Sequence, residues 1–489
     1  MLDIAVIYPN QLFEKLPYRI SDMDIIIITE DCLFFDDPER KLKFNLLKLI
    51  YQRACMRYYF DHLSGKHKSV KYLDYVKKKD HLFQYINNKH DECNLHIIDP
   101  TDHLLQSRIE KYSKKYNHNL VFYHTPMFLL TTDELEEYDS IQKKKKYYQY
   151  NFYIWHRKRT GILMKDDKPI GGKYSYDKYN RKKIANNVDV PDMEKYDNDY
   201  YEEAIEYCEN TFTNYYKENY EPNNIYFYPV THRDAKKHFK RFIDERLQSF
   251  GDYQDAMNMS YPYLFHSVIS PQLNIGLITP DQLIARVLKK KADLASTEGF
   301  IRQLNWREYS RYLYLYGEDM KQNYFNNNKI LNRAWYTGET TIAPVDATIQ
   351  MAFRYGYLHH ILRLMVMCNF MNLCQINPDS VYEWFMEFSL DSYDWVMVNN
   401  VYSMGMYADG GLTMTKPYIS SDNYLTKMGM KCQDDEWKEY WKVLYYYFIY
   451  RNYDKLTGRA AIYRHQWNNL NAKKKVLVKK IAKKFLNNI

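Results

Sequence analysis

The first part of the chain alternates short apolar runs with helical segments, and this alternation restricts the fold more than any other feature. Strands that alternate with helices pair in parallel, and helices then cover both faces of the sheet. We therefore predict an α/β domain with a Rossmann-like parallel sheet over residues 1–133, containing a long helix at 39–63. The candidate buried strands are Asp3–Tyr8, Asp24–Thr29, Ser69–Leu73, Asn94–Ile98 and Leu120–Tyr123.

Beyond residue 230 the apolar residues follow helical spacing almost throughout, so we predict a large all-α domain over residues 226–489. Residues 134–225 carry weaker periodicity and more charge, which indicates a linker between the two domains that contains some helix and a basic segment. The predicted helices of the second domain cover 234–250, 280–292, 297–316, 345–373, 378–392, 433–450 and a basic amphipathic segment at 473–489.

Composition narrows the class of protein. Apolar residues make up 46% of the 489, and Gly and Pro number only 15 each, which excludes collagen-like and Pro-rich disordered chains. The seven Cys form no C-x-x-C pair, so we expect a reducing intracellular compartment such as the cytoplasm and no metal site. Apolar runs are short and no signal peptide is visible, so no membrane association is expected.

Two groups of polar residues could carry chemistry, although no Gly-rich phosphate loop is present. Ser267, Ser270 and Asn274 lie at a loop-to-helix junction, where they could cap the helix or hold a phosphate. His359 and His360 precede Arg363 by three to four residues. Such a pair is either a structural feature of the core or a source of a proton donor.

Aromatic and basic residues leave further alternatives open. Trp384, Tyr393 and the Trp335-Tyr336 pair could form an electron relay, but aromatic residues at helical spacing are usually core. The segment 143–183 is rich in Lys, Arg and Tyr, which suits either a nucleic-acid backbone or a solvated surface.

Several longer strings occur in an order that is more specific than any single motif. On these strings the chain resembles the prokaryotic (6-4) photolyases, a branch of the photolyase/cryptochrome superfamily, from its first strand to its last helices. The strings are Asn10–Leu12, Lys158–Met164, Phe250–Met257, His266–Ser270, Glu298–Tyr309, His359–Met365, Ala408–Gly411 and Lys416–Tyr418.

The resemblance implies a photolyase architecture with FAD bound in a U shape inside the helical domain. An Arg–Asp pair beside a flavin suits the reduced, anionic ring. By motif match, the pyrophosphate would lie at His266, Ser267 and Ser270, with Asn274 nearby. Arg307 and Arg363 would lie beside the cofactor, Asp391 near the isoalloxazine, and Met397 opposite its N5 atom.

The implied activity is light-driven repair of (6-4) pyrimidine–pyrimidone photoproducts in UV-damaged DNA. An electron passes from reduced flavin to the flipped-out lesion and returns after rearrangement, with a positioned acid to protonate the lesion. His360 matches the proton donor and His359 its neighbour. Gln303 and Trp306 match the lesion pocket, Tyr418 and Tyr424 match pocket and DNA-side positions, and Lys158 and Arg159 would face the backbone. We expect the protein to be a monomer. Its gene could belong to a virus.

The sequence departs from the family in its accessory groups. A [4Fe–4S] cluster needs four Cys ligands, but only Cys432 remains, because Pro344 and Asp435 replace two others and the loop before Trp437 is shortened. We therefore predict no iron–sulfur cluster. In the relay Trp384 is kept, and Tyr336 stands where a Trp can occur.

A lumazine antenna remains open, because Glu30 fits such a site whereas Asn10 and Phe34 replace acidic residues. Two rival functions also remain. One is a cryptochrome-like blue-light receptor without repair, and the other is a degenerate nucleic-acid-binding scaffold without photochemistry.

Overall fold

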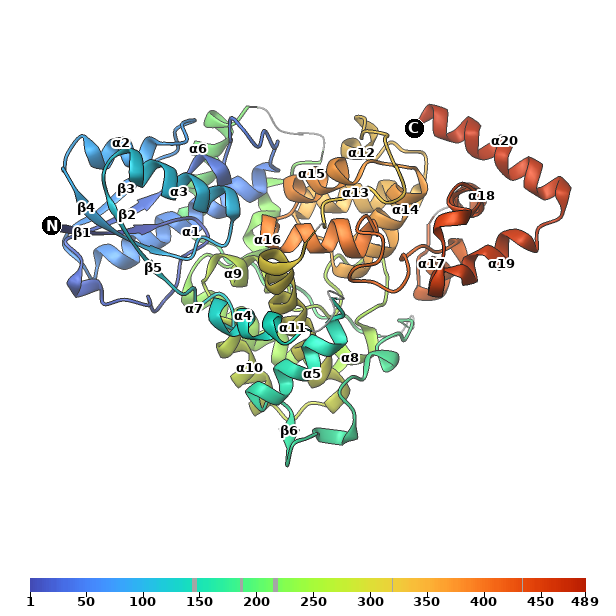
Figure 1. Ribbon diagram of the computed structural model, residues 1–489, viewed down its shortest axis with the longest axis horizontal. Coiled ribbons are helices and arrows are strands. Elements are labelled where there is room, and N and C mark those ends of the chain that lie inside the picture. Colours follow the sequence, from blue (N-terminus) through green and yellow to red (C-terminus); the bar gives the residue numbers. More distant parts are fainter. Residues whose placement is uncertain (143–146, 185–187, 214–218, 319, 433) are drawn as a thin grey trace.

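The structure is a computed structural model of the chain, and it describes all residues except 143–146, 185–187, 214–218, 319 and 433. A five-stranded parallel sheet in the order β3-β2-β1-β4-β5 occupies the N-terminal end (Figure 1). Each predicted strand is confirmed to within one residue. The strands are β1 (Leu2–Ile7), β2 (Ile25–Thr29), β3 (Val70–Leu73), β4 (Cys93–Ile98) and β5 (Asn119–Tyr123), with helices α1 (Leu46–Ser64), α2 (His81–Asn87) and α3 (His103–Lys115).

Helix α1 begins later than the apolar pattern predicts because Asn45 caps it. The Asn45 side chain accepts a hydrogen bond from the amide of Leu47 at 3.0 Å, and its own backbone is extended. Its amide group donates to the carbonyl oxygens of Phe353 and Phe388, at 2.9 and 3.3 Å. The first turn of α1 is thereby fixed against the helical part of the molecule.

The segment 134–225 contains more structure than its sequence predicts. It holds α4 (Thr132–Ser140), α5 (Gln149–Thr160), the short strands β6 (Met164–Lys165) and β7 (Lys168–Pro169), and α6 (Asp199–Thr211). Helix α6 packs on α1 through buried Tyr201, Ala204 and Cys208, and Arg53 forms an ion pair with Glu203 at 2.5 Å. The apolar face of α6 is only one residue wide per turn, so its periodicity is weak in the sequence.

The remainder of the described chain is helical, as predicted. Its α-helices are α7 (His232–Arg241), α8 (Leu247–Tyr253), α9 (Ser270–Ile275), α10 (Pro280–Lys289), α11 (Leu294–Tyr316), α12 (Ala334–Thr337), α13 (Ala343–Tyr355), α14 (Asn369–Leu373), α15 (Pro378–Phe388), α16 (Asp394–Met397), α17 (Asp422–Met428), α18 (Glu436–Arg451), α19 (Ile462–Asn468) and α20 (Ala472–Asn488). Turns of π-helix cover Phe242–Arg246, Leu362–Cys368 and Val398–Gly405, and turns of 3₁₀-helix cover Ile20–Asp22, Cys32–Phe34, Ile170–Gly172, Asp177–Tyr179, Pro222–Phe227, Tyr453–Lys455 and Gly458–Ala461.

The helix predicted at 345–373 is interrupted, and the interruption shapes the site described below. Helix α13 ends at Tyr355, and Gly356 adopts a left-handed backbone with φ of 59°. A Cβ atom at this glycine would lie 1.9 Å from the Leu390 side chain, so a larger residue would displace Leu390 and strain the left-handed backbone. The chain runs through non-helical residues before His360 opens the next helical turn.

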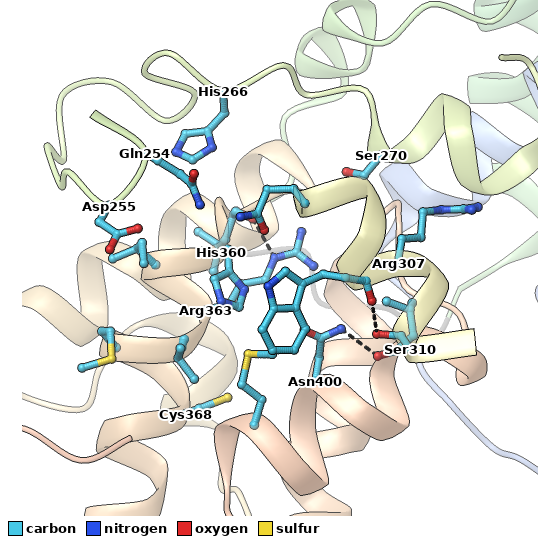
Figure 2. A pocket seen from close by; sticks show the side chains of 18 of the residues that line it. Gln254, Asp255, His266, Ser270, Arg307, Ser310, His360, Arg363, Cys368 and Asn400 are labelled. Atoms are coloured by element: carbon cyan, nitrogen blue, oxygen red, sulfur yellow. Dashed lines mark hydrogen bonds between the residues drawn. The ribbon is translucent and has the colours of Figure 1, made fainter. Parts of the chain in front are cut away.

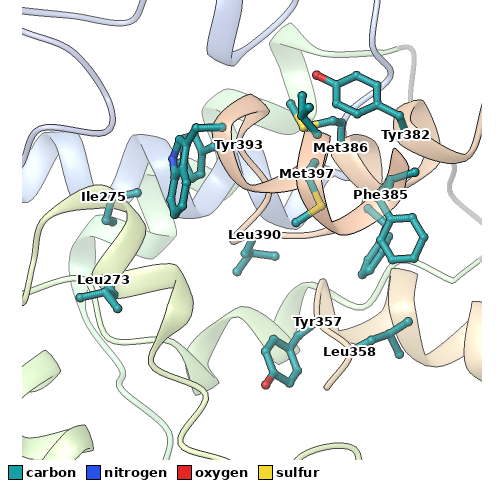
Figure 3. Close-up of a cluster of buried hydrophobic side chains, with 14 of the residues drawn as sticks. Leu273, Ile275, Tyr357, Leu358, Tyr382, Phe385, Met386, Leu390, Tyr393 and Met397 are labelled. Carbon is teal, nitrogen blue, oxygen red and sulfur yellow. The ribbon is translucent and has the colours of Figure 1, made fainter. Parts of the chain in front are cut away.

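The core beneath this turn is apolar and continuous. Figure 3 shows Leu273 and Ile275 of α9 facing Tyr357, Leu358 and Leu390 across the middle of the helical part. These residues form one apolar surface beneath the polar groups of the candidate site. Among the described helices, none is both long and apolar enough to cross a membrane.

Candidate functional site

A cavity of about 590 Å³ lies in the helical part of the molecule (Figure 2). Its walls come from the loop before α9, from α11, from the helical turns after His360, and from residues 391–404 and 416–424. Most of the predicted site residues meet here although they are far apart in sequence. The predicted residues that line the cavity are His266, Ser267, Ser270, Asn274, Gln303, Trp306, Arg307, His360, Arg363, Asp391, Met397, Tyr418 and Tyr424.

Arg363 and Asp391 form a bidentate ion pair in the cavity wall. The guanidinium nitrogens Nη1 and Nη2 lie 3.0 and 3.1 Å from the two carboxylate oxygens. The hydroxyls of Ser270 and Ser389 donate to the same carboxylate at 2.6 and 2.5 Å. Burial alone would raise the pKa of Asp391, but these four donors outweigh it and lower the pKa. The pair is therefore charged and rigid, and the Ser270 hydroxyl is directed at Asp391.

Arg307 forms a second buried cationic group on the adjacent wall. Its Nε atom donates to Asn274 at 3.0 Å, and Asn274 in turn donates to the Asp391 carbonyl at 2.8 Å. The guanidinium also donates to the Met127 carbonyl and lies 4.9 Å from the centre of the Trp395 ring. Burial lowers the pKa of Arg307 to about 9. Arg307 and Asn274 thus connect the cavity wall to the segment that leaves the sheet.

The two adjacent histidines point in different directions, as their spacing predicts. His359 is buried and stacks on His266, with ring centres 4.8 Å apart and planes 7° from parallel. His360 lines the cavity and is exposed (Figure 2). Desolvation by the surrounding walls, together with the Arg363 charge, lowers the pKa of His360 to about 4. Its imidazole is therefore neutral at neutral pH in this state.

Aromatic and amide side chains also line the cavity. Gln303 and Trp306 are three residues apart on α11, so both face inward from one side of that helix. Tyr418 and Tyr424 approach from the segment around α17, and Tyr463 of α19 lies beside them in the wall, which we call the rim. The cavity thus offers flat rings and an amide as well as charged groups.

Sequence reasoning missed several residues that line the cavity. Asp255 is mostly buried there, and burial raises its pKa to about 6, while Arg181 lies 3.5 Å away. Asn400 and Cys368 also line the cavity. Asp255 lies inside the string Phe250–Met257, which carried the resemblance but suggested no role, so only the fold reveals its position.

The predicted relay residues lie outside the cavity. Phe385 lines it, and Trp384 lies behind Phe385 with ring centres 5.1 Å apart. Phe353 lies 5.9 Å from both Trp384 and Tyr336, so these rings form a series that leads to the partly exposed Tyr336. Tyr393 is not in this series, because it is buried against the N-terminal domain.

The basic residues near the predicted linker are only partly neutralised. Arg159 forms ion pairs with Glu134 and Glu137 at 3.1 and 3.0 Å, and Lys182 pairs with Asp252 at 2.8 Å. The four consecutive lysines at 143–146 lie outside the described residues. Within the described part of the segment, exposed lysines without an ion pair remain, namely Lys158, Lys165, Lys168, Lys173, Lys178 and Lys183.

The positions expected for an iron–sulfur cluster hold unsuitable groups. Pro344 is buried in the first turn of α13, and Asp435 is an exposed residue that precedes α18. Burial raises the pKa of Cys432 to about 11, which disfavours its thiolate. Trp437 packs against Trp441 with ring centres 5.8 Å apart. Within the part of the chain that the structure describes, no three His, Cys, Asp or Glu side chains gather to hold a metal ion.

The residues considered for an antenna site contact other residues of the N-terminal domain. Glu30 is buried and accepts hydrogen bonds from Arg53 at 2.9 Å and Tyr72 at 2.6 Å. The Asn10 amide donates to the Pro100 carbonyl at 3.0 Å, and Phe34 is buried. Glu30 and the Asn10 amide nitrogen therefore have partners within the domain, whereas the Oδ1 atom of Asn10 is buried without one among the described residues.

Comparison with protein families matches both halves of the chain. Residues 5–219 match the model "Deoxyribodipyrimidine photo-lyase-related protein", and residues 300–440 match "FAD binding domain of DNA photolyase". A "(6-4) photolyase" of Agrobacterium fabrum is 30% identical over 439 residues, which are 85% of each chain. The "Uncharacterized protein R852" of Acanthamoeba polyphaga mimivirus is 50% identical over 192 residues, covering 38% of this chain and 98% of that protein.

Solved structures show the same fold. A class III photolyase from Agrobacterium tumefaciens superposes with a TM-score of 0.59 at 13% identity, covering 99% of this chain and 98% of the other. A cryptochrome from Synechocystis sp. PCC6803 also gives a TM-score of 0.59, at 11% identity, covering 98% of this chain and 94% of the other.

Proposed function

The chain belongs to the prokaryotic (6-4) photolyase family of the photolyase/cryptochrome superfamily, and from this we propose that it repairs (6-4) photoproducts in DNA by light-driven electron transfer. One observation carries the proposal. One cavity in the helical part is lined both by His360 and by the ion pair of Arg363 and Asp391. Trp306 and the tyrosines of the rim line the same cavity.

FAD fits the residues of this cavity. A volume of about 590 Å³ is in the range of cofactor sites. The Nε2 atom of His266 and the Nε1 atom of Trp395 are buried and lack hydrogen-bond partners within the described structure, and both residues line the cavity. Buried polar atoms are costly without partners, so a polar ligand is expected there. The chemistry that FAD would supply is absorption of light and reversible donation of one electron.

The cavity residues have separate tasks in the proposed reaction. Ser267 and Asn274 would bind the polar part of the cofactor, and Arg363 with Asp391 would hold the flavin by charge and hydrogen bonds. Met397 lines the same wall but has no proton to donate. Hydrophobic residues beneath exclude water from this wall and strengthen its electrostatic interactions.

His360 would supply a proton to the lesion. Its ring is neutral in the DNA-free protein, because the cavity lowers its pKa to about 4. A negative charge beside the ring raises that pKa, so the phosphates of bound DNA would favour a ring that takes a proton from solvent before electron transfer. That proton would pass to the lesion anion and leave the imidazole neutral again. The buried ring of His359, stacked on His266, would keep this segment in place. Proton donation would then stop the electron from returning early.

The remaining rim residues would receive the flipped lesion. Gln303 can donate and accept hydrogen bonds at a pyrimidine edge, and Trp306 offers a flat surface for stacking. Tyr418 and Tyr424 would line the entrance from the DNA side. We also propose that the rings of Trp384 and Tyr336, connected through Phe353, conduct electrons to the cofactor.

We further propose that the protein has no iron–sulfur cluster. Cys432 is the one remaining Cys at the positions that the family uses, and a single thiolate cannot hold such a cluster. Iron analysis of protein purified without oxygen should give no stoichiometric iron. A content of about four iron atoms per chain would overturn this proposal.

Replacement of His360 tests the proposed activity. The variant His360→Ala should keep FAD and DNA binding, since Arg363 and Asp391 are untouched, and should lose repair. Lesion loss under blue light is measured on a duplex with one (6-4) photoproduct, beside flavin absorbance and DNA affinity. Repair at the wild-type rate would remove His360 from the mechanism.

The structural similarity to a cryptochrome supports a second candidate function, that of a light receptor without repair activity. Such a receptor would hold FAD and respond to light, yet leave the lesion unchanged. His360 favours repair, because a receptor has no need of a proton donor beside the rim. Under the repair proposal the partner is UV-damaged DNA and the protein acts as a monomer, and its viral relative supports a viral gene.

A further inference from the structure

Positive charge is concentrated at the C-terminal end of the chain. Residues 451–489 contain eleven Lys and Arg and one acidic residue, Asp454, so this stretch has a formal charge of +10 against +8 for the whole chain. Segment 143–183 has a comparable formal charge of +11, and the rest of the chain is acidic. A polyanion that binds by charge would be attracted to both basic stretches.

The lysines of α20 are free of ion pairs, unlike Arg159, Arg181 and Lys182 near the linker. All seven lie on one helix without an acidic residue, and none of them is in an ion pair within the described structure. Most are solvent-exposed. They are Lys473, Lys474, Lys475, Lys479, Lys480, Lys483 and Lys484.

Packing fixes the direction in which these lysines point. Val478, Ala482 and Leu486 are buried, and their spacing of four residues places them on one face of α20, against α18. The other faces of the helix therefore present lysines to solvent. Lys479 lies 3.8 Å above the ring of Tyr450, which is 40% exposed.

This surface is continuous with the rim of the cavity. Figure 1 shows α17, α18, α19 and α20 together at the end of the molecule opposite the sheet. Helix α19 directs Tyr463 into the cavity rim, where its hydroxyl donates to the Pro417 carbonyl at 3.0 Å. The same helix carries Trp467, whose ring lies 5.6 Å from the Lys475 ammonium of α20. One short helix thus connects the rim to the lysines.

We propose that α19 and α20 form a surface that binds the phosphate backbone of duplex DNA beside the lesion. This inference rests on the proposed function for the identity of the polyanion. Lysines on a fixed helix neutralise phosphates without reading sequence, and each neutralised phosphate releases counterions. The surface would add phosphate contacts that the ion-paired Arg159 and Lys182 do not offer.

Packing argues for DNA over an anionic membrane. A helix that lies on a membrane buries its apolar face in the lipid, but the apolar face of α20 is already covered by α18. Only Val476 and Leu477 are exposed apolar residues on this helix, at 68% and 53%. Vesicles of anionic lipid are therefore included in the test as the competing outcome.

The test replaces exposed lysines and measures binding to undamaged DNA in the dark. The variant combines Lys473→Gln, Lys480→Gln, Lys483→Gln and Lys484→Gln, since Gln keeps helix propensity. The matched control replaces exposed lysines without ion pairs on the N-terminal domain, namely Lys15, Lys68, Lys111 and Lys114, with Gln. Thermal unfolding by circular dichroism checks that both variants fold.

Fluorescence anisotropy with a labelled duplex at several salt concentrations gives the outcome. We expect the α20 variant to lose affinity by about tenfold or more at physiological salt, with a shallower salt dependence, because each lost phosphate contact removes about 0.9 from the slope. The control should bind like the wild type. Equal binding by the wild type and the α20 variant, an equal loss in the control, or binding of the wild type to anionic vesicles but not to DNA would each overturn the proposal.

This design distinguishes a failure of the proposed DNA-binding surface from a failure of the proposed repair reaction. With saturating lesion DNA, the α20 variant should repair at the wild-type rate, because no residue of the cavity is changed. If the α20 variant loses DNA affinity and no protein repairs the lesion, the surface is confirmed and the proposed reaction is wrong.

Discussion

At the scale of single residues, the site depends on charges and rings held by buried neighbours. The sequence predicted most side chains that line the cavity, because they lie in strings with a clear resemblance. It did not predict that His359 stacks on His266, since that contact requires the turn at Gly356. It also missed Asp255, because an isolated carboxylate shows no pattern until the fold buries it.

The ion pair of Arg363 and Asp391 gives a prediction for stability. Arg363→Met leaves the Asp391 carboxylate buried without its cation, and we expect a loss of about 3–5 kcal/mol in the free energy of unfolding. Adding Asp391→Asn should restore much of this loss, because the uncompensated charge is gone. Urea unfolding of the FAD-free protein measures both. A loss below about 1 kcal/mol in the single variant would contradict the role given to the pair.

At the scale of secondary-structure elements, wide apolar faces were predictable and narrow ones were not. The five strands follow short apolar runs and α11 a long helical pattern, and each was found where expected. Helix α6 was not predicted individually because its sequence is acidic and rich in Tyr. Helix α5 lies in the segment that was predicted to be a linker. The break at Gly356 was also missed, because one glycine within an apolar pattern does not distinguish a break from a tolerated residue.

Helix α5 gives a prediction for pH dependence. His156 is buried against Phe152, and burial lowers its pKa from 6.5 to about 4. As the pH falls through this window, the unfolded chain takes up a proton that the folded chain refuses, so stability is lost. His156→Phe should reduce that loss by about 3 kcal/mol between these pH values, at 1.36 kcal/mol for each pK unit.

Stability is measured by urea unfolding of both proteins at pH values across and above the window. The difference between them should stay constant above the window, where the imidazole is neutral in both states. An unchanged dependence on pH in the variant would mean that His156 binds its proton equally in the folded and unfolded chains.

At the scale of the whole molecule, the N-terminal and helical parts share polar contacts that no local pattern predicts. Lys48 of α1 is buried, and its ammonium donates to the carbonyls of Met386 and Ser392 at 2.9 and 2.8 Å. Burial lowers the pKa of Lys48 to about 7. Residues more than three hundred positions apart form these contacts, so only the folded chain reveals them.

The cap of α1 tests how strongly the two parts are connected. Asn45→Ala removes the cap and leaves the carbonyls of Phe353 and Phe388 without this donor, so we expect a loss of about 2–4 kcal/mol. Asn471→Ala is the matched control, because Asn471 caps α20 at the surface and should cost only about 1 kcal/mol. Equal losses in the two variants by urea unfolding would show that the contacts between the parts contribute little.

The central claim is that the cavity performs light-driven repair of the (6-4) lesion, and one assay tests it most directly. Protein with reduced FAD is mixed with duplexes that carry either one (6-4) photoproduct or one cyclobutane dimer, in blue light and in darkness. We predict that the (6-4) photoproduct disappears only in the light and that the cyclobutane dimer persists. A (6-4) photoproduct that survives illumination unchanged would contradict the account.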